Sequence, residues 1–417
     1  MIYMNKLFYN LGTMDQRAEK LEERKNYDST LKIGLSIKPE KQKNKYELYY
    51  VPTLETINLI KNINLYDKKI AKLYEKLPNI AKESFYIDIV SSEIQNTNNI
   101  EGVESRREDI VYTTKEVIKN KIKNKNNNLK FLSIVKSYTA IKNINDNSIN
   151  NDSTKKIKDI RDIRKIYDSI TAEGVTKENL PDGELFRKGV VYIQGKKGTI
   201  HDGVSNSDNS EPIIKELLSK LIDFINIQEC NLIKNAIFHY YFGYIHPFYD
   251  GNGRTARFIS SLILQEDYSW LTSCSLSQGV NKKRNLYLKA FENTNSLAMQ
   301  GEMNFFIDSF LELINIGQSE IFDNLYNKTI LLEAAYNFIK EDERVTVDEK
   351  MFNIVYSAVQ MYLFGNNDYI ELKDIESLAN CGDTKARRYA NNLCDMKILK
   401  KISQKPIRLV LEPGYIG

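Results

Sequence analysis

The chain of 417 residues has few cysteines and no long apolar run, and each absence excludes a class of protein. The four cysteines lie far apart and form no CxxC pair, which argues against a disulfide framework and a zinc site. No apolar run approaches the length of a membrane span, and the first twenty residues lack the apolar core and cleavage site of a signal peptide. We therefore expect a cytoplasmic protein without a membrane partner.

Net charge is also nearly absent. The 59 Lys and Arg residues exceed the 55 Asp and Glu residues by a formal charge of +4, so the total makes no case for nucleic-acid or membrane binding. Hydrophobic residues at 42% and charged residues at 27% are typical of a soluble globular protein. The length exceeds what one hydrophobic core usually supports, so we expect two or three domains.

The spacing of apolar residues predicts a mainly α fold in four parts. Residues 1–45 are charged and aperiodic and are interpreted as a loosely held N-terminal arm. Residues 46–128 form an N-terminal helical region, because apolar residues recur there at intervals of three and four. Residues 129–325 form a helical core. Within it, residues 185–204 are interpreted as one β-hairpin, because two extended runs flank Gly-Lys-Lys-Gly.

The remaining segments complete this division. Two Lys/Asn-rich connectors, residues 117–128 and 143–156, flank a short amphipathic helix. Residues 330–417 contain three helical stretches followed by two short extended runs. Three helices and a hairpin suggest a winged-helix-like domain at this end.

The stretch HPFYDGNGRTAR, residues 246–257, concentrates polar and charged side chains in twelve positions. An apolar-rich helix precedes it and is expected to end at His246, because Pro247 disfavours helical geometry in the residue before it. A second helix is expected from Arg254 onward. The stretch is therefore predicted to be a loop between two helices, with a histidine at one end and arginines at the other.

The middle of this loop is suited to an anion. Gly251 and Gly253 can adopt positive φ, so that consecutive backbone N–H groups, with that of Asn252 between them, can turn inward as a nest. The N-terminus of the following helix favours an anion as well. Asp250 would repel a phosphate unless a divalent cation joined them, so carboxylate and phosphate oxygens together predict a Mg²⁺ site.

The flanking side chains suggest group transfer from a nucleotide to a hydroxyl. Arg254 and Arg257 are three residues apart on one helix face and can grip successive phosphates. His246 can accept a proton near neutral pH. Two other chemistries are disfavoured: the loop lacks the Gly-Lys-Ser/Thr of a P-loop, and His239 lies roughly 10 Å along the helix from His246, too far for joint ligation of zinc. We expect His239 to be a packing or loop-bracing residue.

HPFYDGNGR resembles the signature HPFx(D/E)GN(G/K)R of the Fic family, most of whose studied members transfer AMP from ATP onto protein hydroxyls. The resemblance covers roughly residues 85–315. It includes the predicted hairpin, which is similar to the Fic flap, with Arg187 before it. It implies an all-helical Fic core with a β-hairpin flap, to which the winged-helix-like module is added.

The resemblance implies that His246 deprotonates the target hydroxyl and that Asp250 holds Mg²⁺ across the α- and β-phosphates of ATP. The hydroxyl would attack the α-phosphorus and pyrophosphate would leave. Phe248 would anchor the loop in the core. The flap would hold the target segment as an added strand.

It also implies the residues that bind the phosphates. Gly251, Asn252 and Gly253 would form the nest, Arg254 would contact the phosphates and Arg257 would meet the γ-phosphate. What selects the base lies outside the motif, where Tyr287 is a candidate for stacking. No base preference follows from the motif itself.

A second motif lies upstream. TNNIEG, residues 97–102, is similar to the inhibitory pattern (S/T)xxxE(G/N) of Fic proteins with an N-terminal inhibitory helix. Thr97 and Glu101 are one helical turn apart, and Gly102 allows the helix to end there. The carboxylate would pair with Arg257 and occupy the place of the γ-phosphate. In some relatives the equivalent glutamate also activates water to remove AMP.

Three functions therefore stay open. The first is an autoinhibited protein adenylyltransferase acting on a Tyr, Ser or Thr hydroxyl of another protein or of itself. The second is a Fic transferase of UMP, phosphate or phosphocholine. The third is a winged-helix regulator with a silent Fic module.

The C-terminal module makes DNA a candidate partner. The stretch that would be its recognition helix carries Lys385, Arg387 and Arg388, although Asp383 and Asp395 dilute the charge. Winged helices also mediate protein contacts, and oligomerisation stays open.

Overall fold

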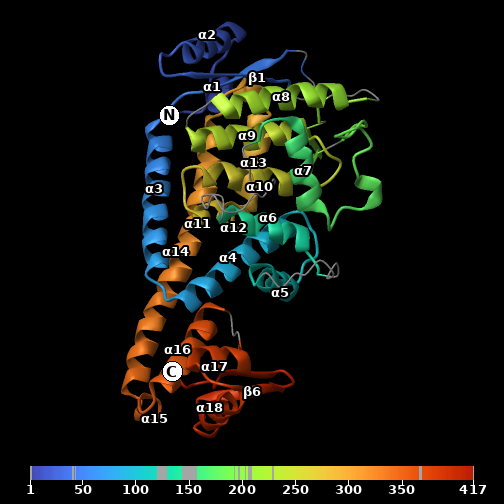
Figure 1. Cartoon of the computed structure of the whole chain (residues 1–417). Helices are drawn as coiled ribbons and strands as arrows, with labels where there is room; N and C mark the ends of the chain where they lie inside the picture. The colour runs from blue at the N-terminus through green and yellow to red at the C-terminus, as the bar shows by residue number, and fades with distance from the viewer. Residues whose placement is uncertain are drawn as a thin grey trace. The chain divides into compact units, whose positions relative to one another are not determined.

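The computed structural model describes residues 2–39, 42, 44–119, 129–142, 157–191, 193–195, 198–201, 203–204, 209–227, 230–365 and 369–416. The fold of these residues is mainly α-helical with few, short strands, as predicted (Figure 1). Of the two predicted connectors, all of 143–156 and all but the first three residues of 117–128 lie outside this description. None of the described helices combines the length and the apolar character needed to cross a membrane.

The chain divides into two compact units, Met1–Lys68 with Val90–Glu320, and Lys69–Ile89 with Ile321–Gly417. The four-part division made from the sequence stays a prediction. The first unit begins with α1 (Met4–Asn10), α2 (Met14–Lys25), β1 (Leu31–Ile37) and β2 (Tyr46–Tyr50). The predicted hairpin is formed by the antiparallel strands β3 (Ile193–Gly195) and β4 (Gly198–His201).

Helices make up the rest of the first unit, and three of them, α3, α4 and α14, extend into the second. They are α3 (Leu54–Glu75), α4 (Asn79–Ile100), α5 (Arg107–Ile118), α6 (Leu132–Lys142), α7 (Ile160–Thr171), α8 (Glu211–Ile227), α9 (Asn231–Ile245), α10 (Asn252–Gln265), α11 (Trp270–Ser273), α12 (Leu276–Lys282), α13 (Arg284–Thr294) and α14 (Asn304–Glu341), with the 3₁₀ turns η2 (Lys177–Asn179) and η3 (Leu297–Met299).

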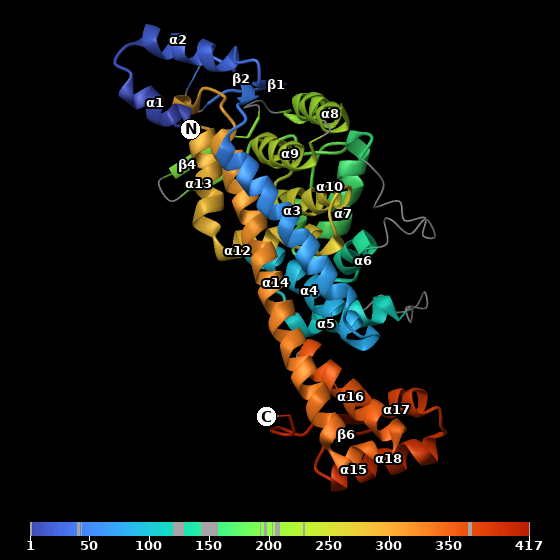
Figure 2. The same cartoon turned by 90° about the vertical axis from the view of Figure 1, so that its left-hand side faces the viewer.

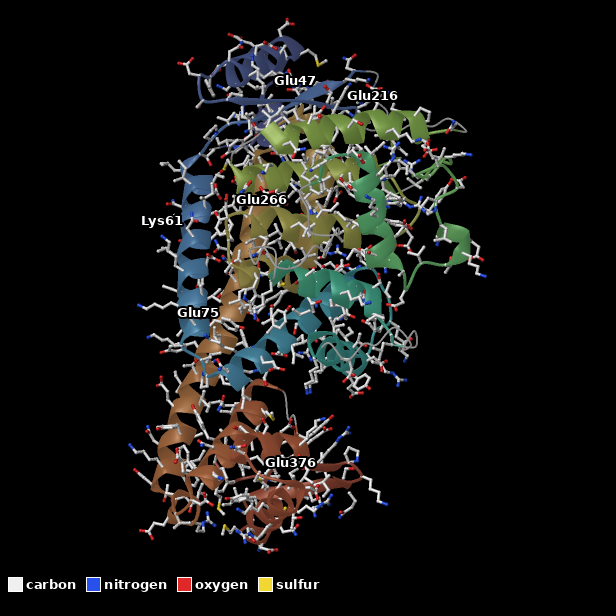
Figure 3. All side chains as sticks on the ribbon, viewed as in Figure 1. Glu47, Lys61, Glu75, Glu216, Glu266 and Glu376 are labelled. Atoms are coloured by element: carbon white, nitrogen blue, oxygen red, sulfur yellow. The ribbon has the colours of Figure 1, made fainter. Side chains whose placement is uncertain are left out.

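Helix α9 is the centre of the first unit. It lies between α8 and α10 (Figures 1 and 2), and every residue in it except Gly243 is buried. Its sequence, NLIKNAIFHYYFGYI, is apolar on all sides, which is typical of a helix that solvent does not reach. Glu266, labelled in Figure 3, follows α10 and pairs with Lys234 of α9 at 3.1 Å. Because α9 and α10 are fixed against each other, the loop between them is held at both ends.

The interpretation of residues 1–45 as a loosely held arm is wrong. Met4 of α1 is fully buried, and β1 buries alternate residues, Ile33, Leu35 and Ile37, on one face. Strand β1 pairs with β2 in an antiparallel hairpin. The alternation in β1 spans a single short strand, which is too little to stand out from a charged background.

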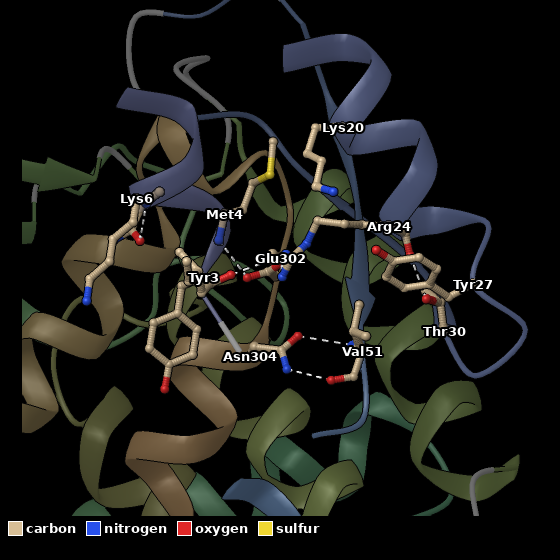
Figure 4. A network of polar contacts seen from close by, with 12 residues as sticks. Tyr3, Met4, Lys6, Lys20, Arg24, Tyr27, Thr30, Val51, Glu302 and Asn304 are labelled. Carbon is tan, nitrogen blue, oxygen red and sulfur yellow. Dashed lines mark hydrogen bonds and ion pairs between the residues drawn. The ribbon is translucent and has the colours of Figure 1, made fainter. Parts of the chain in front are cut away.

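A buried ion pair fixes this N-terminal segment (Figure 4). Arg24 of α2 pairs with Glu302, and both side chains are almost completely buried. The backbone N–H of Met4 donates to the same carboxylate at 2.9 Å. Beside it, the Asn304 side chain accepts from the N–H of Val51 at 3.0 Å and donates to its carbonyl at 2.6 Å. The first fifty residues are thus attached to the segment that leads into α14.

The second unit contains α15 (Glu343–Thr346), α16 (Glu349–Phe364), β5 (Ile370–Glu371), α17 (Leu372–Ala379), α18 (Asp383–Asp395), β6 (Leu399–Gln404) and β7 (Ile407–Leu411). The three strands form an antiparallel sheet in the order β5-β7-β6. The three helices and the hairpin predicted here are present as α16, α17, α18 and β6–β7, and β5 is added to them. The interpretation of this part as a winged-helix-like module stays a prediction.

The buried pair yields a stability prediction. Arg24→Met leaves Glu302 buried without its cation, which costs about 3–5 kcal/mol when one partner of a buried pair is removed. We expect amide hydrogen exchange in α1 and β1 to accelerate by about 100-fold or more, while exchange in α9 is unchanged. Lys20→Met is the matched control, because Lys20 pairs with Glu23 at the surface of the same helix. Unchanged exchange in Arg24→Met would show that the pair does not hold the segment.

Candidate active site

At its start, the loop after α9 has the backbone geometry that the sequence predicts. Helix α9 ends at Ile245, and His246 adopts the left-handed conformation with φ 52° and ψ 64°. Gly251 is also left-handed, with φ 80°, but the expectation of positive φ at Gly253 is wrong, because this residue lies inside α10. Helix α10 begins at Asn252, two residues earlier than the expected start at Arg254. The loop is therefore short, and a non-glycine left-handed residue, uncommon in proteins, aims His246 out of the helix.

Aromatic stacking and an asparagine hold the loop to the core. The Phe248 ring is fully buried and stacks on Tyr167 of α7, with ring centroids 3.7 Å apart and 15° between the planes. The Asn252 side chain accepts from the N–H of Phe248 at 3.0 Å and donates to its carbonyl at 2.8 Å. Asn252 thus closes the loop through its side chain in addition to its backbone.

Arg187 fixes the other side of the loop. Its fully buried guanidinium donates to the carbonyl of His246 at 2.7 Å through Nε and to that of Ile245 at 3.4 Å through Nη2. Burial lowers the pKa of Arg187 to about 10, so it stays protonated at neutral pH. A cation beside the last carbonyls of a helix is stabilised by the partial negative charge at that end of the helix dipole. Arg187 therefore holds His246 in its left-handed conformation.

The start of α10 has the features of an anion site beside a carboxylate. Its first N–H groups have no acceptor inside the helix. The Asp250 side chain is half-buried and accepts from the N–H of Gly251 at 2.5 Å. A Cβ at Gly251 would come 2.5 Å from Thr171 Cγ2, so that a side chain does not fit here. Glycine at this position therefore lets the loop pack closely against α7.

Arg254 is fully buried below this loop. It donates to the carbonyl of Glu173 at 2.9 Å and to that of Gly174 at 3.4 Å. Its Nε has no hydrogen-bond partner among the described residues. A buried guanidinium N–H without an acceptor has unused capacity for an anion.

Arg257 is also fully buried and is occupied by the end of α4. Its Nε donates to Thr97 Oγ1 at 2.9 Å, and its Nη2 donates to the Thr97 carbonyl at 3.1 Å and to Glu101 Oε1 at 2.7 Å. Its Nη1 has no hydrogen-bond partner in the described part of the chain. Burial alone would raise the pKa of Glu101, but Arg257 outweighs it and holds that pKa below its ordinary value. The carboxylate is therefore charged at neutral pH.

The ion pair between Glu101 and Arg257 lies directly over the loop. Helix α4 ends at Ile100, and Gly102 has φ 74°. A Cβ at Gly253 would come 2.2 Å from Glu101 Oε1 and 2.9 Å from Arg257 Nη1. The glutamate, the arginine and the first turn of α10 thus meet at Gly253.

A cavity of about 530 Å³ opens beside this meeting point. It is lined by Glu101, Gly102, Val103, Glu104, Lys130, Phe131, Glu173, Gly174 and Asp250. All of the expected site residues lie in the first unit, and Glu101 and Asp250 face this space from opposite elements. No group of three or more His, Cys, Asp or Glu side chains among the described residues is arranged to hold a metal ion.

Behind the site lie buried polar residues that do not face it. His239 is fully buried, and its ring nitrogens lie 2.9 Å from Ser260 Oγ and 2.8 Å from the Tyr287 hydroxyl, which confirms that it is a packing residue. Tyr287 is correspondingly engaged and buried, so the structure does not support it as a stacking surface for a base. Glu93 of α4 is also buried, and its Oε1 accepts from the N–H of Ser277 at 3.2 Å.

Several residues that position the loop were not predicted from the sequence. They act through their backbone carbonyls or lie far from the loop along the chain. Helix α7, with Tyr167 and Thr171, was not predicted, although its capping residue Asp159 and its strong amphipathic pattern are visible in the sequence. Arg187 was noticed only as a neighbour of the hairpin. The carbonyls of Glu173 and Gly174, which accept from Arg254, have no sequence signature.

Parts of the chain are similar to known proteins in sequence and in fold. Residues 157–264 match the model of the Fic/DOC family. A Fic family protein from Desulfovibrio desulfuricans G20 has a similar structure, with a TM-score of 0.50 and 17% identity over 88% of this chain and 99% of that one. A Fic domain containing signaling protein from Bacteroides thetaiotaomicron VPI-5482 matches 64% of this chain and 94% of that one, with 18% identity and a TM-score of 0.42. Residues 134–508 of Fic-1 from C. elegans match 66% of this chain and 74% of that one, with 16% identity and a TM-score of 0.41.

Two buried groups behind the site predict opposite effects of pH on stability. Burial lowers the pKa of His239 to about 3. At pH values below the ordinary pKa of histidine, the unfolded chain takes up a proton that the folded chain does not. Stability therefore falls as pH falls. Burial raises the pKa of Glu93 to about 7, so its contribution is present at low pH and is lost as pH rises toward that value.

We therefore expect His239→Gln to remove a rise in the free energy of unfolding between about pH 5.5 and about pH 7.5, and Glu93→Gln to remove a fall, each on the order of 1 kcal/mol. Denaturant titrations followed by the fluorescence of Trp270, the single tryptophan, measure both. The description fails if the two variants change the pH dependence in the same direction.

Proposed function

Because residues 157–264 form a Fic/DOC family domain, we propose that this protein is an autoinhibited protein adenylyltransferase. It transfers AMP from ATP to a Tyr, Ser or Thr hydroxyl of a target protein or of itself. Proteins with Fic domains are generally transferases that modify proteins. The observation that carries the finer proposal is Arg257, a buried cation paired with Glu101 over the start of α10, whose Nη1 has no acceptor among the described residues.

The buried arginines and the helix start recognise the triphosphate. Among the described residues, Arg254 Nε and Arg257 Nη1 have no hydrogen-bond partner, and the first N–H groups of α10 have no acceptor within the helix, so these donors are available to an anion. Because both arginines are out of water, each bond to a phosphate oxygen is stronger than it would be at the surface. The γ-phosphate takes the place of the Glu101 carboxylate at Arg257.

His246 supplies the base. Arg187 binds the backbone carbonyl of His246, and the left-handed conformation places this residue just after the end of α9. The imidazole accepts the proton of the target hydroxyl while the oxygen attacks the α-phosphorus, and pyrophosphate leaves. The chain's contribution is positioning and charge stabilisation, because the phosphoryl chemistry itself needs little covalent help from the protein.

Asp250 fits a Mg²⁺ ion that is shared with the nucleotide. Its carboxylate is a hard oxygen donor on the wall of the cavity. No other carboxylates of the described residues complete a metal cage around it, so phosphate oxygens and water would supply the remaining ligands. Mg²⁺ would neutralise charge on the α- and β-phosphates.

Glu101 makes the enzyme autoinhibited. While its carboxylate pairs with Arg257, ATP binds with its γ-phosphate displaced, and the α-phosphorus is not in line with the attacking hydroxyl. Displacement of the end of α4 removes this block. The same carboxylate faces the cavity, where it can activate water for the reverse reaction, removal of AMP.

The two other functions differ in what they require. A Fic transferase of UMP, phosphate or phosphocholine would use the same loop with another donor molecule. A regulator with a silent Fic module would need no donor, and the presence of His246, Asp250 and Arg257 in one constellation counts against it.

The proposal predicts that Glu101→Gly releases activity. Incubated with Mg²⁺ and each nucleoside triphosphate separately, the variant is expected to gain the mass of one adenylyl group with ATP alone, measured by intact mass spectrometry. The double variant with His246→Ala gains none, because the base is missing. Wild type gains little. If the protein does not modify itself, transfer of labelled AMP to lysate proteins and release of pyrophosphate give the same comparison.

Either of two results would contradict the proposal. Transfer from another nucleoside triphosphate or from a phosphocholine donor would establish the second function. Binding of ATP by the Glu101→Gly variant without transfer to any protein would favour the silent module.

Substitution of Thr97 is expected to relieve the inhibition only in part. Thr97→Val removes the hydroxyl that accepts from Arg257 Nε but leaves the ion pair with Glu101. A hydrogen bond to a charged group contributes about 1.5–3 kcal/mol, of which the retained ion pair masks a part, so we expect activity roughly tenfold above wild type and well below Glu101→Gly. Ser91→Ala, six residues earlier on α4 and hydrogen-bonded to Thr114 instead, is the control. Activity of Thr97→Val equal to wild type would mean that Thr97 does not support the inhibited state.

A further inference from the structure

The C-terminal unit separates its charges along the chain. Residues 383–408 hold eight basic and two acidic residues, a formal charge of +6, in a protein whose total is +4. Residues 341–376 hold nine acidic and three basic residues, a formal charge of −6. Glu376, labelled in Figure 3, belongs to the acidic segment. A local charge of this size marks an electrostatic footprint that the total conceals.

The basic segment begins with the second helix of a helix–turn–helix. Helix α17 ends at Ala379, Asn380 takes a left-handed conformation with φ 45°, and α18 begins at Asp383. The two helices pack against each other, and α18 also packs against β6. The hairpin β6–β7 follows directly, so the helix and the hairpin belong to one compact body.

Helix α18 presents a broad polar face to solvent. Its buried side consists of Ala386, Tyr389, Ala390 and Leu393. On the opposite side Thr384, Arg388, Asn391 and Asp395 are exposed and follow one another at i, i+4, i+7 and i+11, which places them in one row along the helix. Arginine reads guanine, asparagine reads adenine and threonine contacts either base, so the row has the composition of a major-groove reader.

The hairpin places further cations beside this row. Lys401 Nζ of β6 lies 3.5 Å from Asn391 Oδ1, so the strand runs next to the exposed face of α18. Lys400 and Lys405 of the hairpin are exposed. Arg408, by contrast, is engaged, because it pairs with Glu371 at 3.3 Å and lies over the Tyr369 ring. The two exposed lysines are therefore the hairpin cations that can reach phosphates.

We propose that this surface, defined by Thr384, Arg388, Asn391, Lys400 and Lys405, binds double-stranded DNA. Helix α18 lies in the major groove with its polar row toward the base edges, and the hairpin lysines contact the phosphates beside the groove. Duplex RNA is excluded, because its major groove is too deep and narrow for side chains on a helix to read. This function is independent of the transferase, since all of its residues lie in the second unit.

Fluorescence anisotropy of the full-length protein with a labelled random duplex of about 30 base pairs tests the proposal. We expect a dissociation constant on the order of 10⁻⁴–10⁻⁶ M at physiological salt and an affinity that falls steeply with salt concentration. Lys400→Ala with Lys405→Ala is expected to weaken binding about tenfold or more and to reduce the slope of log affinity against log salt by about 2, one for each phosphate contact. Lys340→Ala, in the exposed last turn of α14, is the matched control and changes neither.

Selection of bound sequences from a random library separates base reading from charge. Wild type is expected to enrich a preferred sequence, and Arg388→Ala with Asn391→Ala to lose that preference while keeping the salt slope. All substituted positions are exposed, and circular dichroism melting verifies that the variants fold. Three results would overturn the proposal: no DNA binding at about 50 mM salt, unchanged binding in the lysine double variant, or equal affinity for duplex RNA of the same length.

Discussion

A guanidinium that is removed from water has to be paired, and the pairing of Arg257 determines the arrangement of the site. Arg257 lies on α10, and every acceptor recorded for its side chain outside α10 lies at the end of α4, on Thr97 and Glu101. Removing a charged acceptor from a buried cation costs several kcal/mol, so α4 cannot move away from α10 unless another anion replaces the carboxylate. The γ-phosphate of a nucleotide is such an anion. In the proposed function, a tethered carboxylate and a diffusing phosphate would compete for one buried arginine, so the same contact would be both a structural support and an inhibitor.

A second buried arginine gives the loop its precision. The Arg187 guanidinium donates hydrogen bonds to the carbonyls of Ile245, His246 and Gly189. On the other side of the loop, Phe248 stacks on Tyr167. The loop is thereby held by charge at one end and by ring packing at the other. A base that must lie within hydrogen-bond reach of a target hydroxyl needs this rigidity, because small displacements of a catalytic group cost large factors in rate. Burial lowers the pKa of Arg187 to about 10, which still leaves it protonated and able to hold the loop at neutral pH.

The loop itself was predictable from sequence, because its signals are local. Pro247 ends α9 before it, and Gly251 turns the chain into α10. The pairing of Glu101 with Arg257 came from a resemblance, since nothing in the sequence near either residue names the other. The acceptors of Arg254 could not be predicted at all, because a backbone carbonyl carries no residue identity. The N-terminal segment was misjudged for a related reason. In the sequence Arg24 looks like one more surface charge, because its partner Glu302 is far along the chain.

The protein thus presents cations to anions in two physically different ways. Arg254 and Arg257 are fully buried, preoriented by neighbouring carbonyls and hydroxyls, and surrounded by protein, so mobile ions screen them little. Contacts made there depend on the shape of the ligand and on how its charges are spaced. Lys400 and Lys405 are in water, where screening acts within about 8 Å at physiological ionic strength, so contacts made there depend on salt and on the charge density of a polymer. A small polyphosphate gains little from the second surface, and a duplex cannot enter the first. Under the two proposals, arginine and lysine charges would therefore serve two ligands without competition, because burial decides which ligand each surface can bind.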